Sequence, residues 1–370
     1  MPARMVTLES EHSMLTAAGA AAATGVRTFS ATSSQGLLHA MEMLYTVAGW
    51  RVPFVLVNVS RGLSAPITLE ADHNDAMAAR DSGFVQIHCS TCQEVVDTTL
   101  IAYRLAEDPR VRLPVMVNLD GFLLSFTREP VDLPDEGEAR QFLPAFDPGS
   151  IRFRAGRPIS QAVAVLGGGP YSYFRYESHL AAMEALEVHR FVADEFASRF
   201  GRRYDAVECY RTDDAEVVLV MVGSYATKAR AAVDAMREAG EPVGLVRLRM
   251  LRPLPVTDLR DALAGKRAVA VIDQNLAPGR GGALHGEIAT ALYGTKDAPP
   301  ILASFIGGLG GRDITDEEFY EIVRQTREAA SSGAAPEPRL LFDETELREV
   351  RKLQAIAHAE REQTGGGDVG

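Results

Sequence analysis

Short apolar runs alternate with helix-forming segments along most of this sequence, and that alternation restricts the chain to a small set of folds. The first runs cover residues 26–31, 53–60, 84–89 and 113–121, and helix-like segments cover 37–48, 73–81 and 92–107. The runs are apolar throughout rather than at every second residue, which is typical of parallel strands that helices cover on both faces. The pattern predicts a doubly wound α/β domain with a parallel sheet.

The same alternation returns in the second half of the chain. The expected strands are 215–224, 243–251, 267–275 and 300–308, and the expected helices are 227–240, 254–265, 282–294 and 315–330. We therefore expect two doubly wound parallel-sheet domains, over residues 1–202 and 203–330. The tail over residues 331–370 begins with a disordered-looking stretch and is expected to carry a polar helix from Glu344 to Glu362.

Two parts of the first region differ from this alternation. Residues 126–170 are rich in charge, proline and glycine, which predicts a long and largely irregular connection, followed by a helix from Glu177 to Phe200. Residues 10–24 are rich in alanine and predict a short helix that can lie close to a neighbour. Glu11 falls in the first turn of that helix, where a carboxylate suits the helix dipole.

Charge and cysteine content exclude several classes of function. The net charge of −12 argues against nucleic acid or an anionic membrane surface as the main partner. The sequence has no apolar stretch of membrane-spanning length and no apolar signal core at its start, so we expect a cytoplasmic protein. The three cysteines do not provide a disulfide framework, which is consistent with a reducing compartment.

Polar turns follow the first two expected strands, at Thr32–Gly36 and Ser60–Gly62. Ligands of open α/β sheets bind beyond the carboxyl ends of strands, so these turns are the first candidate site. Arg61 lies in the second turn, and a guanidinium there can hold a planar carboxylate through two parallel hydrogen bonds. Pairing with a nearby acidic side chain of the protein is an equally good interpretation of Arg61.

Cys89 and Cys92 suggest a metal site by their spacing. Structural zinc and iron–sulfur clusters normally take four ligands, and only Cys209 and His88 are further candidates. We therefore expect a structural role for these cysteines and no metal site in the chain.

His73 lies between Asp72 and Asp75, a grouping that could serve acid–base chemistry or metal binding. Because the group opens an expected helix, a capping arrangement is the more common explanation. The glycine-rich segments 167–170, 278–282 and 307–311 match neither the GxGxxG nucleotide fingerprint nor a phosphate loop, and we expect them to shape turns.

Segments from both halves of the chain match those of a known family in the same order. In the first half they are TSSQGL, PFVLVNVSRGLSAP, DHNDAMAARDSGF, QEVVDTTLIAYRLAE and VNLDGF; in the second they are GRRYDAVECY, AEVVLVMVGS, LRMLRPLP, VIDQN and FIGGLGGRD. Together they resemble the α subunit of 2-oxoacid:ferredoxin oxidoreductases, typified by pyruvate:ferredoxin oxidoreductase. The resemblance runs from about Glu11 to Arg327.

The resemblance implies a thiamine-diphosphate pyrimidine-binding-like domain followed by a transketolase C-terminal-like domain. In that family the cofactor lies between the α subunit and a partner domain on the β subunit. Glu11 matches the glutamate that hydrogen-bonds the aminopyrimidine ring, and Ser34 and Gln35 lie in the turn expected to contact the cofactor. Arg61 matches the arginine that orients the substrate carboxylate. Glu11 and Arg61 are thus the expected catalytic residues.

The implied reaction is oxidative decarboxylation of pyruvate or a similar 2-oxo acid to acyl-CoA and CO₂, with reduction of ferredoxin. The implied partners are a β subunit that carries the diphosphate site with its magnesium, and γ- and δ-type subunits with coenzyme A and iron–sulfur functions. Two alternatives stay open. One is a non-catalytic structural subunit of such a complex, and the other is a β-type subunit of a 2-oxoacid dehydrogenase, which the segments SRGLSAP and GLGGRD fit poorly.

Members of the resembled family begin with an extra segment that ends in a Tyr-Pro-Ile-Thr-Pro turn, whose threonine contacts the substrate. That motif is not found in this sequence. We expect that a separate chain supplies it, that the sequence is truncated, or that the subunit has diverged.

Overall fold

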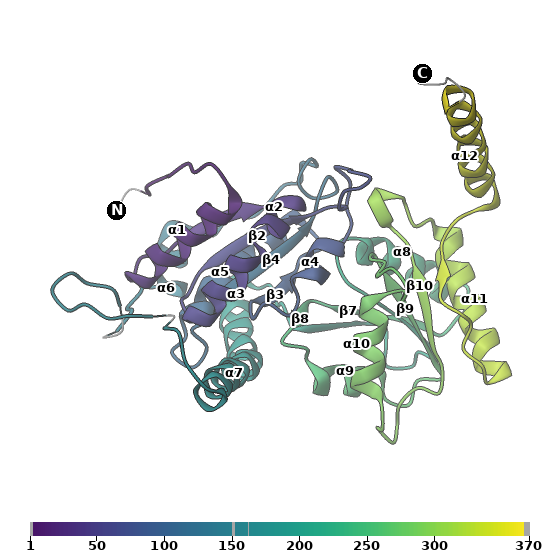
Figure 1. Cartoon of the computed structure of the whole chain (residues 1–370). Coiled ribbons are helices and arrows are strands. Elements are labelled where there is room, and N and C mark those ends of the chain that lie inside the picture. Colours follow the sequence, from purple (N-terminus) through teal and green to yellow (C-terminus); the bar gives the residue numbers. More distant parts are fainter. Residues whose placement is uncertain (1–2, 150–151, 162, 366–370) are drawn as a thin grey trace.

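The computed structural model describes residues 3–149, 152–161 and 163–365, which form two α/β halves side by side (Figure 1). The elements up to residue 200 are α1 (Glu11–Ala23), β1 (Phe29–Thr32), α2 (Gln35–His39), α3 (Met41–Trp50), β2 (Val55–Ser60), α4 (Asn74–Ala78), β3 (Val85–His88), α5 (Cys92–Glu107), β4 (Val115–Asp120), α6 (Glu136–Phe142) and α7 (Gly168–Phe200).

The elements that follow form the second half and the tail. They are β5 (Val207–Tyr210), β6 (Val217–Met221), α8 (Tyr225–Glu238), β7 (Val243–Leu248), β8 (Met250–Arg252), α9 (Val256–Leu263), β9 (Ala268–Asp273), α10 (Ala283–Leu292), β10 (Leu302–Ile306), a 3₁₀ turn (Leu309–Gly311), α11 (Asp316–Ser332), β11 (Arg339–Leu340) and α12 (Glu344–Gly365). In the part of the chain that is described, none of the helices combines the length and apolarity needed to cross a membrane.

Both sheets are parallel except at one edge. The first has the order β1-β2-β4-β3-β8 and the second the order β11-β10-β9-β6-β7-β5. The edge strands β8 and β5 pair antiparallel to β3 and β7, whereas every other pair is parallel. The expected architecture of two parallel α/β sheets is confirmed.

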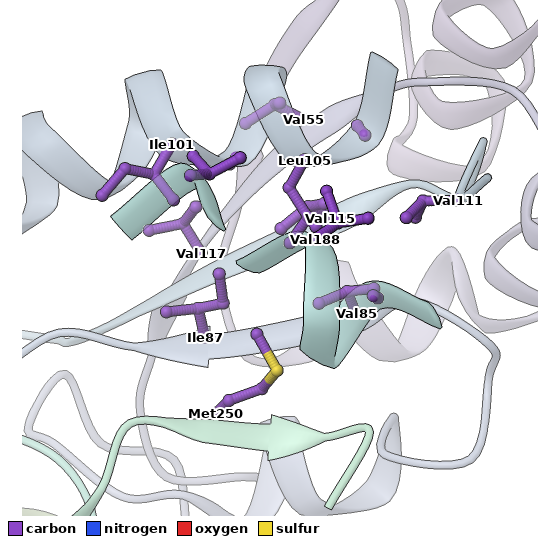
Figure 2. Close-up of a cluster of buried hydrophobic side chains, with 14 of the residues drawn as sticks. Val55, Val85, Ile87, Ile101, Leu105, Val111, Val115, Val117, Val188 and Met250 are labelled. Atoms are coloured by element: carbon purple, nitrogen blue, oxygen red, sulfur yellow. The ribbon is translucent and has the colours of Figure 1, made fainter. Parts of the chain in front are cut away.

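Helices cover both faces of the first sheet, as the continuously apolar strands predicted. On one face α5 and α7 pack against the central strands (Figure 2), and on the other α1, α2 and α3 do so. The side chains of the first layer include Val55, Ile87, Ile101, Leu105, Val115, Val117 and Val188. In the second half, α8 and α11 cover one face of the sheet, and α9 and α10 cover the other.

The structure corrects several predicted boundaries. The helix predicted over residues 37–48 is divided into α2 and α3 at Ala40, whose ψ is 3°; no glycine or proline there signals the break. The connection over residues 126–170 contains α6 and the start of α7. Helix α7 begins at Gly168 rather than Glu177, with Pro170 in its first turn, where proline is tolerated. Its first turns expose their aromatic side chains, so the sequence there lacked a periodic apolar signal.

Two strands, β5 and β11, were missed, and the single strand predicted over residues 243–251 is divided into β7 and β8. Strand β5 is a partly buried edge strand, and β11 has only two residues. Strand β8 falls in the range predicted for the second domain, yet it pairs with β3 in the first sheet. Met250 of β8 joins the core between the first sheet and α7 (Figure 2). The chain therefore crosses back to the first half before α9 begins.

Candidate functional site

Helix α1 places Glu11 at the edge of the first sheet. Ser10 caps the helix by accepting a hydrogen bond from the Ser13 backbone N–H at 3.2 Å, so Glu11 is the first helical residue. The small side chains of α1 let it lie close to α3, as predicted, because a Cβ atom on Gly19 would come within 2.6 Å of Val47. The packing of α1 on α3 thus fixes where Glu11 stands.

The Glu11 carboxylate meets the turn that follows β1. Its Oε2 atom lies 3.2 Å from Nδ1 of His39, the last residue of α2. A Cβ atom on Gly36 would lie 2.8 Å from Oε1, so only glycine leaves room for the carboxylate there. The backbone N–H of Glu11 and the His39 ring lower the pKa of Glu11, which is therefore ionised at neutral pH. The side chain remains 44% exposed and accessible to a ligand.

Ser34 and Gln35 join this turn to the loop after β2. Ser34 is buried in a left-handed conformation with φ of 49°, and its Oγ atom donates to the Gly62 carbonyl at 2.8 Å. The Gln35 side-chain amide donates to Ser64 Oγ at 3.0 Å. The two polar turns that the sequence singled out are therefore in direct contact at the carboxyl ends of β1 and β2.

Arg61 reaches the same turn from the second strand. Its Nε atom donates to Ser33 Oγ at 2.6 Å, and its Nη1 atom donates to the Thr68 carbonyl at 3.3 Å. Both acceptors are neutral oxygens, and among the described residues no carboxylate forms an ion pair with Arg61. Its positive charge is thus available to an anion, and the alternative of pairing with an acid of the protein is not what the structure contains.

The geometry therefore brings together all of the predicted site residues. Glu11 contacts the Gly36 end of the turn, and Arg61 contacts the Ser33 end. The sequence did not identify His39 as the partner of Glu11, because the two are 28 residues apart and no motif links them. Ser33 and Thr68 were missed as supports of Arg61 for the same reason.

Comparison with known proteins gives the family of the chain. Residues 2–193 match the family described as pyruvate flavodoxin/ferredoxin oxidoreductase, thiamine diphosphate-binding, and residues 215–319 match pyruvate:ferredoxin oxidoreductase core domain II. The chain is 41% identical over 326 residues to pyruvate synthase subunit PorA of Methanothermobacter thermautotrophicus, covering 88% of this chain and 83% of that one. The chain belongs to the 2-oxoacid:ferredoxin oxidoreductase family. It is an α-type subunit of such an enzyme.

Other relatives extend the family resemblance. Pyruvate synthase subunit PorA of Thermotoga maritima is 41% identical, with 89% of this chain and 82% of the relative covered. Ketoisovalerate oxidoreductase subunit VorA of Pyrococcus horikoshii is 37% identical, with 89% and 82% covered. The fold is also similar to that of the 2-oxoglutarate:ferredoxin oxidoreductase of Magnetococcus marinus, with a TM-score of 0.61 at 19% identity. That match covers 88% of this chain and 57% of the other.

His73 lies outside the candidate site of this oxidoreductase subunit. It occupies the N-cap position of α4 but does not cap it with its side chain. Instead its Nε2 atom lies 2.6 Å from Oδ1 of Asp120, and Oδ2 of Asp120 accepts hydrogen bonds from the backbone N–H and the hydroxyl of Ser224. Burial opposes the charged imidazole, but the Asp120 carboxylate, with smaller contributions from Asp72 and Asp75, outweighs burial and raises the pKa of His73. The capping prediction is wrong for His73, which links the two halves.

Asp72 does fulfil the predicted capping role, because its Oδ1 atom accepts a hydrogen bond from the Asn74 backbone N–H at 2.7 Å. Cys89 is buried in the core beneath α5, and burial raises the pKa of its thiol. Cys92 is the first residue of α5. Within the described ranges, no group of three or more His, Cys, Asp and Glu side chains is arranged to hold a metal ion.

The glycine-rich segments have different roles in the structure. In the segment 307–311, a Cβ atom on Gly311 would come within 2.4 Å of Glu70, so the glycine lets the first half approach the second. Gly281 at φ of 100° shapes the turn before α10, as expected. The segment 167–170 does not shape a turn as predicted, because it opens α7.

Proposed function

We propose that this chain supplies the pyrimidine-side half of a thiamine diphosphate site in an enzyme that oxidatively decarboxylates pyruvate to acetyl-CoA with reduction of ferredoxin. The observation that carries the proposal is that an ionised, accessible Glu11 carboxylate and an Arg61 guanidinium without an acidic partner lie at opposite ends of one turn. Opposite charges that the protein itself leaves available at the carboxyl edge of a parallel sheet are suited to a ligand that carries both a hydrogen-bonding ring and a carboxylate.

The residues of the turn fit one end of the cofactor. Gly36 makes room for the Glu11 carboxylate itself, because a Cβ atom there would lie 2.8 Å from Oε1. The carboxylate, which is 44% exposed, can accept a hydrogen bond from a ring nitrogen of the cofactor. When bound, thiamine diphosphate supplies the electron sink that decarboxylation of a 2-oxo acid needs. The carboxylate of Glu11 holds the ring in one orientation and can keep or release a proton at Oε1 or Oε2. We assign cofactor contacts to Glu11, Ser34 and Gln35.

Arg61 is assigned to the substrate. Its guanidinium is held on one side by Ser33 and Thr68, which leaves the remaining N–H groups to orient a carboxylate through charge-assisted hydrogen bonds. Holding that carboxylate fixes the adjacent 2-oxo carbon relative to Glu11. Arg61 thus selects for a 2-oxo acid over an aldehyde.

Partner subunits complete the enzyme in this proposal. A β-type subunit carries the diphosphate and magnesium contacts, and further subunits carry iron–sulfur clusters and coenzyme A functions, as the resemblance to the family implies. Pyruvate is the proposed substrate because several relatives near 40% identity are named pyruvate synthase subunits. We place the enzyme in the cytoplasm, which the three free cysteines support.

The test is to purify the native complex through a tag on this chain, identify the co-purifying chains and measure iron. We expect pyruvate- and coenzyme A-dependent reduction of ferredoxin, exceeding the rates with 2-oxoisovalerate and 2-oxoglutarate. A fully assembled, iron-loaded complex that turned over none of the three acids with thiamine diphosphate and magnesium would show a non-catalytic subunit.

A calorimetric titration of the isolated chain tests the sharing of the cofactor. We expect weak binding of thiamine diphosphate, because the diphosphate contacts lie on the partner. Tight, magnesium-dependent binding by this chain alone would contradict the shared site.

A further inference from the structure

Asp75, on helix α4, lies between the two turns of the candidate site. The residue is fully buried, and one carboxylate oxygen, Oδ2, accepts hydrogen bonds from the backbone N–H groups of Ser34 at 3.2 Å and Arg61 at 3.4 Å. The same oxygen accepts from the side-chain amide of Asn58 at 3.3 Å. A single atom thus connects the turn after β1, the end of β2 and the loop that begins with Arg61.

The surroundings of that oxygen require an acceptor. The Ser34 N–H belongs to a residue with φ of 49°, a strained conformation that needs support from its neighbours. Asn58 is itself fixed, since its amide also donates to Asn118 Oδ1 and Ser60 Oγ, both at 3.0 Å. Three N–H donors therefore point at this position, and a carboxylate oxygen can accept from all of them. An amide nitrogen turned towards them would meet only other donors.

Helix α4 holds Asp75 in a fixed position. The Ala76 backbone N–H donates to the other carboxylate oxygen, Oδ1, at 2.6 Å and holds the side chain in its rotamer. At the start of the helix, the His73 backbone N–H donates to the Gln274 carbonyl at 2.9 Å, and its side chain is paired with Asp120. The helix is therefore attached to both halves of the molecule, and Asp75 transmits that fixed position to the two turns.

We propose that Asp75 is a positioning residue that sets the spacing between the turn bearing Ser34, Gln35 and Gly36 and the turn bearing Arg61. This inference rests on the proposed function, because Asp75 acts on the substrate through Arg61 and on the cofactor through the Ser34–Gly36 turn. It touches neither ligand in this assignment. Its removal should loosen the geometry between the two ligand-binding turns rather than delete a contact with a ligand.

The matched control is Asp273, at the end of β9 in the second half. Asp273 is also fully buried, and it too accepts hydrogen bonds from two backbone N–H groups, those of Leu284 at 2.7 Å and His285 at 3.1 Å at the start of α10. Asp75→Asn and Asp273→Asn therefore make the same chemical change at two buried backbone-binding carboxylates. Only the first lies beside the candidate site.

In the assembled complex, Asp75→Asn should lower kcat/KM for pyruvate by about 10²-fold, mostly through a higher KM, since small misplacements of positioning groups have effects of that size. Asp273→Asn should leave KM and kcat within about two-fold of the wild-type values, although both variants should lower the melting temperature. Equal kinetic effects of the two variants, or none for Asp75→Asn, would overturn the positioning role.

Hydrogen exchange of the purified complex, read by mass spectrometry, tests the contact without using activity. Asp75→Asn should speed amide exchange in peptides that contain Ser34 and Arg61, and Asp273→Asn should do so only around Leu284 and His285. Unchanged exchange at both turns in Asp75→Asn would refute the proposal. The two proposals can fail separately. If the wild-type complex turned over no 2-oxo acid but the variants showed the expected exchange pattern, the proposed function would be refuted and the role of Asp75 in holding the turns would be supported.

Asn58→Ala provides a second variant if Asp75→Asn does not assemble. It removes one donor from the same Asp75 oxygen and retains both backbone contacts. We expect the same two turns to exchange faster and KM for pyruvate to rise a few-fold. If both exchange and KM stayed at wild-type values, the Asn58 hydrogen bond to Asp75 would take no part in holding the turns, contrary to the proposal.

Discussion

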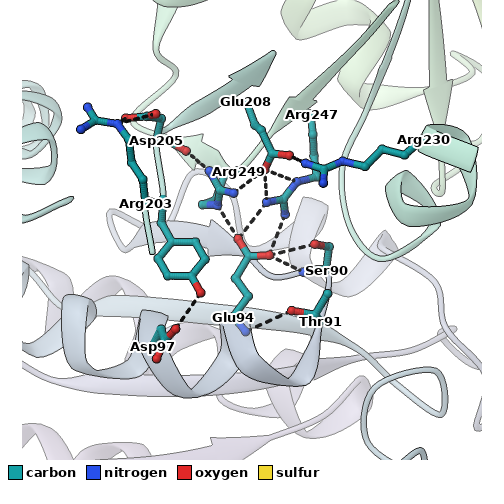
Figure 3. Close-up of polar contacts among 11 residues, drawn as sticks. Ser90, Thr91, Glu94, Asp97, Arg203, Asp205, Glu208, Arg230, Arg247 and Arg249 are labelled. Carbon is teal, nitrogen blue, oxygen red and sulfur yellow. Dashed lines mark hydrogen bonds and ion pairs between the residues drawn. The ribbon is translucent and has the colours of Figure 1, made fainter. Parts of the chain in front are cut away.

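Two of the clusters of charged side chains in this protein are built in opposite ways. The first is the proposed site at the edge of the first sheet, where Glu11 is 44% exposed and Arg61 has only neutral acceptors. The second lies between the two halves, where Glu94, Glu208, Arg247 and Arg249 form a closed network (Figure 3). In the second cluster the Glu94 side chain is only 3% exposed.

Every charge of the buried network has a partner within the protein. Arg247 forms two parallel hydrogen bonds to Glu94, at 2.9 and 3.0 Å, and also contacts Glu208 at 2.6 Å. Arg249 pairs with the same two carboxylates. The Ser90 backbone N–H and hydroxyl satisfy the remaining capacity of Glu94. Burial opposes the charge of Glu94, but the two arginines outweigh it and lower the pKa of Glu94 to about 2.

The difference between the two clusters distinguishes charges that stabilise the fold from charges that can bind a ligand. A closed, desolvated network stabilises the junction between the two halves and has no capacity left for a small molecule. Glu11 contacts the His39 ring, and Arg61 contacts only neutral oxygens. Both side chains can therefore still form hydrogen bonds to a ligand. Substitutions in the first cluster should therefore change turnover with little effect on folding, and substitutions in the second should do the reverse.

The largest expected effect is that of Glu11→Gln. An amide cannot hold the negative charge that we assign to this position, so turnover by the assembled complex should fall below detection, by more than about 10³-fold. Assembly and the melting temperature should be unchanged, because the side chain is half exposed. Steady-state kinetics and size-exclusion chromatography measure the two quantities. Substantial residual activity with an unchanged pH profile would mean that Glu11 serves only the start of α1.

Glu94→Gln should have the largest effect on stability. The substitution leaves two buried guanidinium groups to share a single carboxylate, that of Glu208. Breaking a buried ion pair in this way lowers the free energy of unfolding by about 3–5 kcal/mol. Chemical unfolding of the chain measures that loss. In the complex that still assembles, kcat/KM for pyruvate should remain near the wild-type value. If Glu94→Gln strongly lowered kcat/KM without loss of stability, this network would belong to the active site, and the contrast between the two clusters would be wrong.

Arg61→Met should reduce kcat/KM by roughly two to three decades, from the loss of a charge-assisted contact of about 2–4 kcal/mol. Cofactor affinity should be retained, because the cofactor contacts are assigned to Glu11, Ser34, Gln35 and the partner subunit. Arg61→Lys should recover only part of the activity, since an ammonium lacks the planar fork of the guanidinium. If Arg61→Met stayed within a few-fold of wild type, the arginine would be structural and the carboxylate site would lie elsewhere.

The smallest effect is the pH dependence that the network contributes. The pKa of Glu94 is about 2 in the folded protein, against 4.5 for a free carboxyl group. Its contribution to the free energy of unfolding, on the order of 3 kcal/mol, is therefore present above pH 4.5 and lost as the pH falls towards 2. The gap in unfolding free energy between wild type and Glu94→Gln should narrow over that range. A gap of constant size would show that Glu94 is not ionised in the folded state.

Asp75 contributes to the pH dependence of the unfolding free energy with the opposite sign to Glu94. Burial raises the pKa of Asp75 to about 6 from 3.8. The folded protein therefore takes up this proton more readily than the unfolded chain, and the term adds stability as the pH falls from 6 towards 3.8. Such a carboxylate is kept charged at neutral pH at a cost in stability, as residues that serve a site often are.

Much of the fold could be predicted from local patterns in the sequence. Apolar runs located the central strands, and the small residues of α1 were correctly interpreted as allowing a close approach to a neighbouring helix. The missed strands β5 and β11 are short and lie at the edges of the second sheet, where the apolar signal is weak. The division of residues 243–251 into β7 and β8 has no local signal, because both strands are apolar and they join different sheets. The start of α7 was missed because its exposed aromatic residues show no buried stripe.

The sequence by itself determined the order of strands and helices and the two polar turns, because burial and local hydrogen bonding set residue types within a few positions. It could also name Glu11 and Arg61 by resemblance. Only the tertiary structure decided that Glu11 faces Gly36, that Asp75 bridges Ser34 and Arg61, and that His73 pairs with Asp120. Those partners are distant in sequence, and their meeting depends on how whole helices pack against the sheet, which no local pattern encodes.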